Sequence, residues 1–409
     1  MNITNIAENR DLCCGCNACE TVCPKSAVKM MPDEAGNFYP KVDSEKCVDC
    51  SLCIKVCCET GATQKKIPVK TVAATNRKIS VSMKSSSGGI FSAIAEWVLS
   101  NGGVVFGTVF TESFDAVVIG IETPEELSAM LGSKYVRSQM GTVYRDIEKR
   151  LKEGRQVLFC GVPCQVAAVR KYLRKDYDNL ILADIVCHGT PSNRMFKDYL
   201  DYLSKSRGVD IVDYKFRDKT YGQNHEGTLI YSDSKSKDGG VKRERIRSYK
   251  SSYYQLFLNC STFRESCYNC QFASRERAGD LTLCDYWGVE DFHPEFIKDV
   301  SSAGLCGISA VMLNTDVGLA AFEQIKDRLM YVESDLDKVA YKNPQLNAPS
   351  KKTADHDEIM KLYAEGGYEA VDKYYFKRYR KKIITSAVGR KLPNSLQRKL
   401  IGLNRKILK

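Results

Sequence analysis

The chain has 409 residues, enough for two or three domains, and its 43% hydrophobic and 27% charged residues are typical of a globular protein. No apolar run approaches the ~18 residues of a membrane-spanning helix, and residues 1–12 lack the apolar stretch of a secretory signal. The net charge of +11 lies in residues 373–409, where 13 Lys or Arg and no Asp or Glu leave 11 − 13 = −2 for the rest of the chain.

Cysteine is the outlier of the composition, with 18 residues. We expect the protein to be cytoplasmic. In the cytoplasm thiols stay reduced, so these cysteines are expected to bind metal rather than form disulfides. The pattern CxxCxxCxxxC appears twice near the N-terminus, the second copy 34 residues after the first. This spacing lets a short loop bind three corners of a [4Fe–4S] cluster while its fourth cysteine reaches the other cluster. The predicted ligands are Cys13, Cys16, Cys19 and Cys57 for one cluster, and Cys47, Cys50, Cys53 and Cys23 for the other.

Residues 1–66 therefore form a predicted module with two [4Fe–4S] clusters and a bacterial-type ferredoxin fold. A disulfide framework or zinc ribbons fit the doubled spacing poorly. Cys14 and Cys58 are spare thiols next to predicted ligands, so an exchange of either with its neighbour stays open. Residues 65–78 are expected to be a polar connector.

A Ser/Gly loop, Ser85–Gly89, opens a predicted helix over residues 90–99, whose apolar side chains recur at helical spacing. Such a helix start presents free backbone N–H groups and can hold a phosphate. An equally good alternative is that Ser87 only caps the helix. Further along, Lys134 and Tyr135 stand between small residues and could contact an anionic cofactor.

Predicted strands and helices alternate from residue 104 to residue 205, which indicates parallel strand pairing and an α/β core. Cys164 and Cys187 each follow the end of a predicted strand, the edge at which open α/β sheets bind ligands. The polar stretch 233–247 is expected to be a loop. No GxGxxG turn or P-loop occurs, so neither a standard dinucleotide site nor a nucleoside triphosphatase is supported.

Eight cysteines lie outside the N-terminal module, and Cys267 and Cys270 form a CxxC pair. One pair with scattered partners fits a third cluster, a zinc site or a redox dithiol. We expect a third cluster on Cys164, Cys187, Cys267 and Cys270, because each lies in a Gly/Pro or polar loop suited to a ligand. The other four cysteines are expected to be small buried side chains.

Several motifs together resemble the family of coenzyme F420-reducing hydrogenase beta subunits and their dehydrogenase relatives, over about residues 1–350. They are Ser86-Ser87-Gly88-Gly89, Gly132-Ser133-Lys134-Tyr135-Val136, Gly161-Val162-Pro163-Cys164-Gln165, Cys187-His188-Gly189, Cys267-Tyr268-Asn269-Cys270, and Gly279-Asp280 with Asp285-Tyr286-Trp287-Gly288. The likeness extends to bacterial relatives from polysaccharide gene clusters and to chlorophyll-pathway reductases.

The resemblance implies an α+β or α/β fold class, with the ferredoxin fold followed by an α/β flavin-binding core over residues 67–350. It also implies bound FAD and iron–sulfur clusters that transfer electrons between the FAD and an electron donor. Carried over residue by residue, it places Ser87, Gly88, Gly89, Lys134 and Tyr135 at the flavin, and Gly161, Pro163 and Cys164 where the flavin meets a cluster. No separate signature for coenzyme F420 is present.

The leading hypothesis is an FAD-dependent iron–sulfur oxidoreductase that passes electrons between its clusters, FAD and a small organic acceptor. That acceptor would be F420-like or a substrate of a polysaccharide or lipid-linked sugar pathway. The alternative is a non-catalytic subunit that relays electrons to a partner enzyme. A redox protein such as ferredoxin is the expected partner in either case. His188 could supply a proton, although a histidine bonded to backbone in its loop is the more ordinary role.

Residues 351–409 are expected to form a basic helical tail. Leu396, Leu400, Leu403 and Ile407 recur at helical spacing among basic residues, a pattern typical of a helix on an anionic membrane surface, here the inner face. A solvated or partner-docking helix fits the pattern equally well. Nucleic-acid binding is disfavoured because the aromatic residues of the tail are confined to its start.

Overall fold

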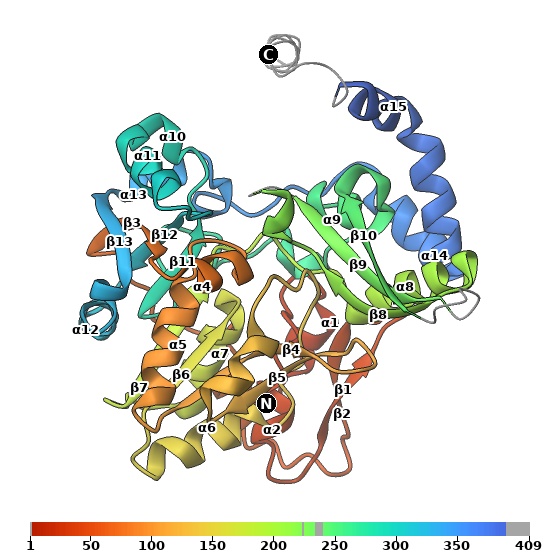
Figure 1. Cartoon of the computed structure of the whole chain (residues 1–409). Coiled ribbons are helices and arrows are strands. Elements are labelled where there is room, and N and C mark those ends of the chain that lie inside the picture. Colours follow the sequence, from red (N-terminus) through yellow and green to blue (C-terminus); the bar gives the residue numbers. More distant parts are fainter. Residues whose placement is uncertain (1, 223–224, 234–239, 390–409) are drawn as a thin grey trace.

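The computed structural model describes residues 2–222, 225–233 and 240–389. Its centre is a large mixed sheet in the strand order β13-β3-β12-β11-β7-β6-β4-β5 (Figure 1). In chain order these strands are β3 (Lys70–Asn76), β4 (Val104–Phe110), β5 (Ala116–Ile121), β6 (Val157–Gly161), β7 (Leu180–Ile185), β11 (Leu281–Asp285), β12 (Ser309–Leu313) and β13 (Leu329–Ser334).

The middle of this sheet is parallel: β4 pairs with β6, β6 with β7, and β7 with β11. The outer strands β5, β12, β3 and β13 run antiparallel to their neighbours. The predicted α/β core is thus confirmed, with antiparallel strands on both sides. Because parallel strands end at a common edge, the segments after β6, β7 and β11 meet there.

Helices cover both faces of the sheet, as a sheet with two apolar faces requires. One face is covered by α5 (Ile90–Ser100) and α12 (Asp316–Glu323). The opposite face is covered by α6, α7, α10, α11 and α13. These helices are α6 (Val143–Lys152), α7 (Pro163–Leu173), α10 (Val289–Phe292), α11 (Pro294–Ser302) and α13 (Leu336–Ala340), and α4 (Ile79–Lys84) precedes α5.

A second sheet stands beside the first, in the order β10-β9-β8. It packs with α8, α9 and α14 around a cluster of aromatic side chains that includes Phe196, Phe216 and Tyr253. Its elements are β8 (Asp210–Lys215), β9 (Glu226–Ser232), β10 (Val241–Arg247), α8 (Asn193–Arg207), α9 (Ser252–Leu258), α14 (His356–Arg378) and α15 (Arg380–Gly389). Short 3-10 helices are η1 (Pro124–Met130), η2 (Lys219–Tyr221), η3 (Ser248–Lys250), η4 (Glu265–Cys267), η5 (Lys326–Arg328) and η6 (Pro344–Leu346).

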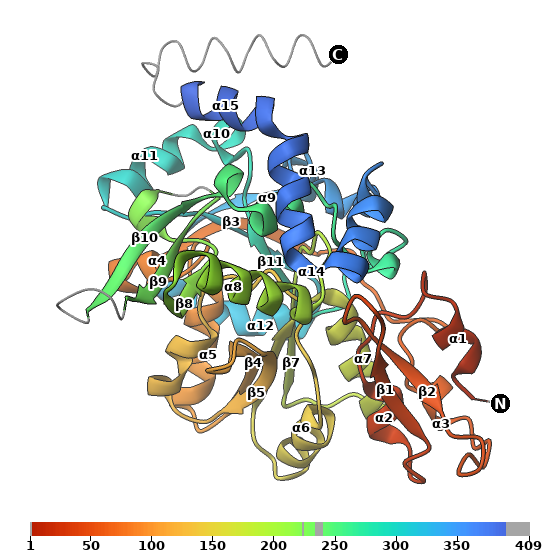
Figure 2. The same ribbon diagram turned by 90° about the vertical axis from the view of Figure 1, so that its right-hand side faces the viewer.

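The N-terminal module consists of one antiparallel hairpin and short helices. These elements are α1 (Thr4–Glu8), α2 (Ala18–Val22), β1 (Val28–Pro32), β2 (Phe38–Val42) and α3 (Leu52–Lys55). The module lies against α7 (Figure 2), and α2 contacts both α6 and α7. Two core side chains donate to backbone carbonyls of its first cysteine run: Tyr144 Oη to Cys16 O at 2.6 Å, and Arg264 Nε to Cys13 O at 2.7 Å. The first run is therefore bonded directly to the core.

Two sequence predictions were wrong. The expected connector 65–78 contains β3, an inner strand of the main sheet. Val72 and Ala73 face opposite sides of that sheet and both are fully buried, so the strand lacks the polar–apolar alternation of a half-exposed strand. The expected loop 233–247 contains β10, an edge strand whose exposed side chains are largely charged.

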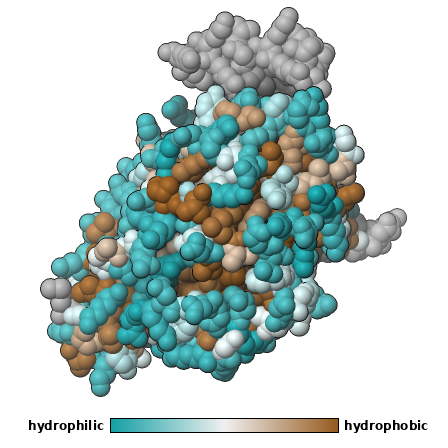
Figure 3. Space-filling view, turned by 90° about the vertical axis from the view of Figure 1, so that its left-hand side faces the viewer, coloured by the Kyte–Doolittle hydropathy of each residue, from teal (hydrophilic) through white to brown (hydrophobic). Residues whose placement is uncertain are grey.

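The start of the expected tail is built into the fold. Buried Ile359, Tyr363, Tyr368, Val371 and Tyr375 of α14 belong to the aromatic cluster beside the second sheet. The stripe from Leu396 to Ile407 lies outside the described residues. Within the described ranges, no helix combines the length and apolarity needed to cross a membrane. Apolar side chains gather around the middle of the face shown in Figure 3, between polar regions.

Candidate functional site

The first predicted cluster set lines one cavity of the N-terminal module. Cys13, Cys16, Cys19 and Cys57 all border this cavity, which measures about 320 Å³. Burial raises the pKa of Cys19, and the neighbouring Cys16, Cys13 and Cys57 raise it further. Gly15 and Asn17 adopt left-handed backbone conformations, and these turns bring the closely spaced cysteines around one centre. The fourth thiol arrives from the second run, just after α3.

The second set lines a separate cavity of about 340 Å³, bordered by Cys23, Cys47, Cys50 and Cys53. Asp49 and Ser51 supply the left-handed turns here. Each cavity thus contains three cysteines of one run and the fourth cysteine of the other. Cys50 is exposed, whereas the four cysteines of the first set are buried. The second cavity is therefore the nearer of the two to solvent.

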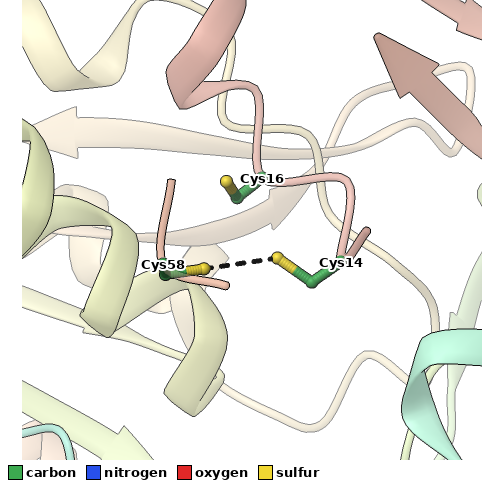
Figure 4. A group of neighbouring side chains, drawn as sticks. All are labelled: Cys14, Cys16 and Cys58. Carbon is green, nitrogen blue, oxygen red and sulfur yellow. Dashed lines mark hydrogen bonds between the residues drawn. The ribbon is translucent and has the colours of Figure 1, made fainter. Parts of the chain in front are cut away.

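The spare thiols lie on the side of the module that faces the core. Cys14 Sγ and Cys58 Sγ are 3.6 Å apart, and these sulfurs and that of Cys16 all lie within 4.8 Å of one another (Figure 4). Both spare cysteines pack in the same apolar cluster as α7. Cys14 borders the first cavity together with Cys13, whereas Cys58 does not border it. This arrangement favours Cys57 over Cys58 as the ligand.

Cys164, Cys187, Cys267 and Cys270 come from three segments that hydrogen bonds join. Arg137 donates to both Cys164 Sγ and Pro191 O, and Arg264 N donates to Thr190 O at 3.1 Å. Cys164 is in the first turn of α7, Cys187 follows β7, and the other two lie in and after η4. Burial raises the pKa of Cys187 to about 12, with contributions from Cys267 and Cys164. Burial likewise raises the pKa of Cys270, and the other three thiols raise it further. Such mutual effects require short distances between the groups. The thiols are suited to a shared soft-metal centre.

The other core cysteines do not join this group. Burial raises the pKa of Cys160 to about 12, and its charged neighbour is Asp184. Burial also raises the pKa of Cys284, whose charged neighbours are Asp285, Arg277 and Asp184 rather than thiols. The sequence alone could not have separated the two sets by spacing, because their members lie far apart in the chain.

The Ser/Gly loop sits at the same sheet edge, between β3 and β12. Gly88 N donates to Ser309 Oγ at 2.8 Å, and Ser87 Oγ donates to Ile308 O at 3.2 Å. Ser87 therefore does not cap α5; the residue before the helix is Gly89, with φ +78° and no side-chain cap. A Cβ on Gly88 would lie 2.4 Å from Ala74 O. Among the residues that the structure describes, no side chain caps the start of α5, as an anion-binding turn requires.

The segment after η1 joins this loop, since Ser133 Oγ donates to Ser86 Oγ at 2.8 Å. Lys134 Nζ donates to the carbonyl oxygens of Leu131, at 3.1 Å, and of Met130, at 3.3 Å. Burial lowers the pKa of Lys134 to about 8. The ring of Tyr135 stacks on Phe257 with centroids 4.3 Å apart. Both residues thus lie beside the loop, but the Lys134 ammonium is bonded to its own segment.

Gly161 and Pro163 bracket the turn from β6 to α7. Pro163 is the first residue of α7, where its missing N–H costs nothing. A Cβ on Gly161 would lie 3.0 Å from the ring of Phe159 and 3.1 Å from Gln165 Oε1. The tight turn positions Cys164 next to the end of β6.

A polar group that the sequence did not single out completes this edge. Arg217, which follows β8, donates to Asp285 Oδ2 at 2.8 Å, and its side chain is only 3% exposed. Its guanidinium lies 5.5 Å from the Trp287 ring, which is also 5.4 Å from the ring of His225. Among the described residues, Arg217 Nη2 and His225 Nδ1 are buried without a hydrogen-bond partner. Buried polar atoms in this state indicate a missing ligand or water.

Lys219 anchors this polar group to the Ser/Gly loop. Its ammonium donates to Ser82 O and Cys306 O, both at 2.6 Å, and also to Ser87 O. Burial lowers the pKa of Lys219 to about 8. Burial also lowers the pKa of His188, while Asp285 acts in the opposite direction. Asp285 and Trp287 belong to one of the motifs, but Arg217, Lys219 and His225 have no sequence signature.

Comparison with known proteins places these elements in a family context. A family model described as "4Fe-4S dicluster domain" matches residues 12–62. Two further models describe the N-terminal and C-terminal parts of the "Coenzyme F420 hydrogenase/dehydrogenase, beta subunit", and they match residues 71–145 and 154–339. Together they include the Ser/Gly loop, the core cysteines and the polar group.

Among curated proteins, the chain is 20% identical over 367 residues to the F subunit of the F(420)H(2) dehydrogenase of Methanosarcina mazei, covering 87% of this chain and 94% of that protein. An uncharacterised ferredoxin of Methanocaldococcus jannaschii is 38% identical over 75 residues, which cover 18% of this chain and 95% of that protein. Among solved structures, a chain of the F420-reducing [NiFe] hydrogenase complex from Methanosarcina barkeri is 14% identical, with a TM-score of 0.40 and coverage of 75% of this chain and 91% of that one.

Proposed function

The chain belongs to the family of coenzyme F420 hydrogenase/dehydrogenase beta subunits and is an iron–sulfur electron-transfer protein, and from this we propose that it is a flavin-dependent oxidoreductase. Electrons would pass between the module's clusters, a third cluster in the core and FAD. The reaction would transfer hydride between the flavin and a small organic molecule, in either direction. The observation that carries this proposal is the approach of the segments that bear Cys164, Cys187, Cys267 and Cys270. Arg137 bonds to Cys164 Sγ and Pro191 O, and Arg264 N donates to Thr190 O.

The proposed route begins at the surface. Cys50 is exposed, so the second cluster site is the point at which a soluble redox protein such as a ferredoxin can approach. The first site lies deeper, where Tyr144 and Arg264 bond its cysteine run to the core. The core thiols lie next, at the carboxyl edge of the sheet. Short spacing between successive centres is what electron transfer through a protein requires.

The residues at the sheet edge fit a flavin in three respects. The start of α5 offers uncapped N–H groups to a pyrophosphate, and Gly88 allows backbone to lie close by. Trp287 supplies a flat aromatic surface. Arg217 Nη2 and His225 Nδ1 are buried hydrogen-bonding atoms without partners among the described residues. When bound, a flavin supplies the conversion between one-electron and two-electron chemistry.

The chain's own residues would position and tune that group. Arg217, oriented by Asp285, would direct a donor toward electron-rich oxygen or nitrogen atoms. Lys219 would hold the Ser/Gly loop in place through its three carbonyl contacts. The acceptor class that we propose first is a deazaflavin such as coenzyme F420, which the names of the matching family and of the curated relative mention. A substrate of polysaccharide or lipid-linked sugar synthesis is the second class.

A second candidate function is that of a relay subunit without a substrate of its own. The curated relative is named as one subunit of a dehydrogenase, so it works beside other proteins. In that case the clusters would pass electrons to another protein. Turnover of F420 by the isolated, cofactor-loaded chain would support the enzyme. Reversible bleaching of the clusters without any conversion of F420 would support the relay.

The experiment that tests the cofactor content is anaerobic purification with iron, sulfide and flavin measured in the same sample. About 12 irons from three four-iron clusters, with one FAD, are expected. Cys267→Ser should lower the iron content to about eight, whereas the nearby Cys260→Ser should leave it unchanged. A wild-type content of about eight irons would remove the third cluster. Iron without flavin, in a preparation that retains weak ligands, would overturn the flavoenzyme.

A further inference from the structure

One arginine lies beside the core cysteine group. Arg137 is held in place by its backbone, since its N–H donates to Pro191 O at 2.9 Å. Its Nη1 donates to Cys164 Sγ at 3.2 Å. Its Nε and Nη2 have no accessible surface and no partner among the described residues. A buried guanidinium with two unused donor nitrogens is costly unless something absent from the protein chain accepts their protons.

The charge of Arg137 acts on thiols of both groups. Burial opposes its charged form, but Cys164, Cys14 and Cys16 outweigh this effect and raise the pKa of Arg137. Arg137 in turn lowers the pKa of Cys13 in the first set and of Cys187 and Cys267 in the core set, against the larger effect of burial. Its only short-range side-chain acceptor among the described residues is a sulfur. Arg137 therefore contacts one core thiol directly, and its charge also acts on thiols of the first set.

Cys14 is linked to members of both groups. Its sulfur lies within 4.8 Å of that of Cys16, a member of the first set. On its other side, hydrogen bonding with Cys14 raises the pKa of Cys164, a member of the core set. A thiol that belongs to neither proposed ligand set is thus linked to a member of each set.

We infer that Arg137 is the counter-ion of the core cluster, and that it raises the reduction potential of that cluster. The inference rests on the proposed third cluster. One electron leaves the first cluster and enters the core cluster, no bond is made and no proton moves. The added negative charge develops beside a fixed positive charge, and N–H donors directed at cluster sulfur favour the reduced state. Arg137 stays protonated throughout, because a guanidinium does not titrate in this range.

The test is a potentiometric titration of the anaerobically purified full-length protein, followed by electron paramagnetic resonance. Arg137→Gln removes the charge, and Arg137→Lys keeps the charge but loses the planar set of donors. Arg145→Gln is the matched control, because Arg145 Nη2 also bonds to the module, donating to the backbone oxygen of Thr21 at 2.7 Å rather than to a thiol. Iron content is measured for every variant.

We expect Arg137→Gln to lower the equilibrium ratio of reduced core cluster to reduced second cluster about tenfold. For a one-electron couple, this is a fall of about 59 mV in the reduction potential of the core cluster. Arg137→Lys should show a smaller shift, and Arg145→Gln none. About 12 irons in every variant with unchanged potentials would overturn the role of Arg137 alone. About eight irons and no core-cluster signal in the wild type would overturn the third cluster and this inference together. A third outcome is that Arg137→Gln loses iron, whereas Arg137→Lys keeps its iron and has the reduction potential of the wild type. That result would assign Arg137 a purely structural role and overturn the inference.

Discussion

At the scale of single residues, adjacent cysteines with opposite roles provide a sharp test. Cys57 borders the first cluster cavity, whereas its neighbour Cys58 points instead to Cys14. We predict that Cys57→Ser loses one cluster, about four irons per chain, and that Cys58→Ser keeps all of them. Iron analysis and electron paramagnetic resonance of both variants measure this. Equal losses in the two variants would contradict the assignment of the ligand.

A second residue-scale prediction concerns the pH dependence of stability. Burial, with help from Arg217, lowers the pKa of His225 to about 4, against ~6.5 in an unfolded chain. Between these values the unfolded chain binds a proton that the folded protein does not, so the free energy of unfolding falls as the pH falls from ~6.5 to ~4. This contribution is about 2 kcal/mol between pH 7 and pH 5.

We predict that His225→Gln removes this part of the slope. Anaerobic urea unfolding of wild type and variant at pH 7 and at pH 5 measures it, and the difference between the two proteins cancels acid effects on the clusters. Lowering the pH from 7 to 5 should reduce the free energy of unfolding of the wild type by about 2 kcal/mol more than that of the variant. Parallel pH profiles would show that His225 is protonated equally in the folded and unfolded states.

At the scale of elements, the Ser/Gly loop joins α5 to β3 and β12. A Cβ on Gly88 would meet Ala74 O at 2.4 Å and Ser309 N at 2.9 Å, backbone atoms that cannot rotate away. We predict that Gly88→Ala costs about 1–3 kcal/mol through overpacking and lowers flavin retention. Flavin content after desalting and thermal unfolding measure these effects.

The control for this variant is Gly102→Ala, in the turn after α5. Gly102 has a left-handed backbone, with φ +72°, but a Cβ there meets nothing within 4 Å. It should lose some stability and keep its flavin. Equal flavin retention in the two variants would mean that the loop does not contribute to the flavin site.

Elements also show where sequence reasoning works and where it stops. The N-terminal module could be predicted, because metal ligation fixes the spacing of its cysteines along the chain. For the core cysteines, the parallel strands predicted only that Cys164 and Cys187 follow strand ends at one edge of the sheet. The strand β3 could not be predicted, because burial on both faces removed the polar–apolar alternation. Arg137, Arg217 and His225 carry no local pattern. Only the packing of distant segments makes them neighbours of thiols or of Trp287.

At the scale of the whole molecule, the excess positive charge and the proposed redox groups lie in different parts of the sequence. The proposed redox groups lie within residues 13–306, and the excess positive charge lies in residues 373–409. We predict that truncation after Gly389, which removes seven Lys or Arg, lowers binding to anionic vesicles at least about tenfold, since each basic residue near such a surface contributes ~1 kcal/mol. Co-sedimentation at low salt measures this.

Two controls test whether the loss of vesicle binding comes from the charge of the tail. Neutral vesicles should bind neither protein, and iron content should be the same in both. A full-length variant with Leu396, Leu400 and Leu403 changed to Ser keeps every positive charge and separates the apolar from the electrostatic contribution. Equal binding of truncated and full-length chains to anionic vesicles would exclude the tail as a membrane contact.

The bonds from Tyr144 and Arg264 to the first cysteine run have a consequence for biosynthesis. During translation, Cys57 leaves the ribosome about 200 residues before Arg264, a delay of about 10–40 s at 5–20 residues per second. Throughout that interval the nascent chain displays all the cysteines of the module without the guanidinium that later braces Cys13. Iron delivered early would have to survive on an unbraced loop. Delivery after chain release would instead meet a finished, partly closed site, so the order of synthesis favours a carrier that protects the emerging thiols.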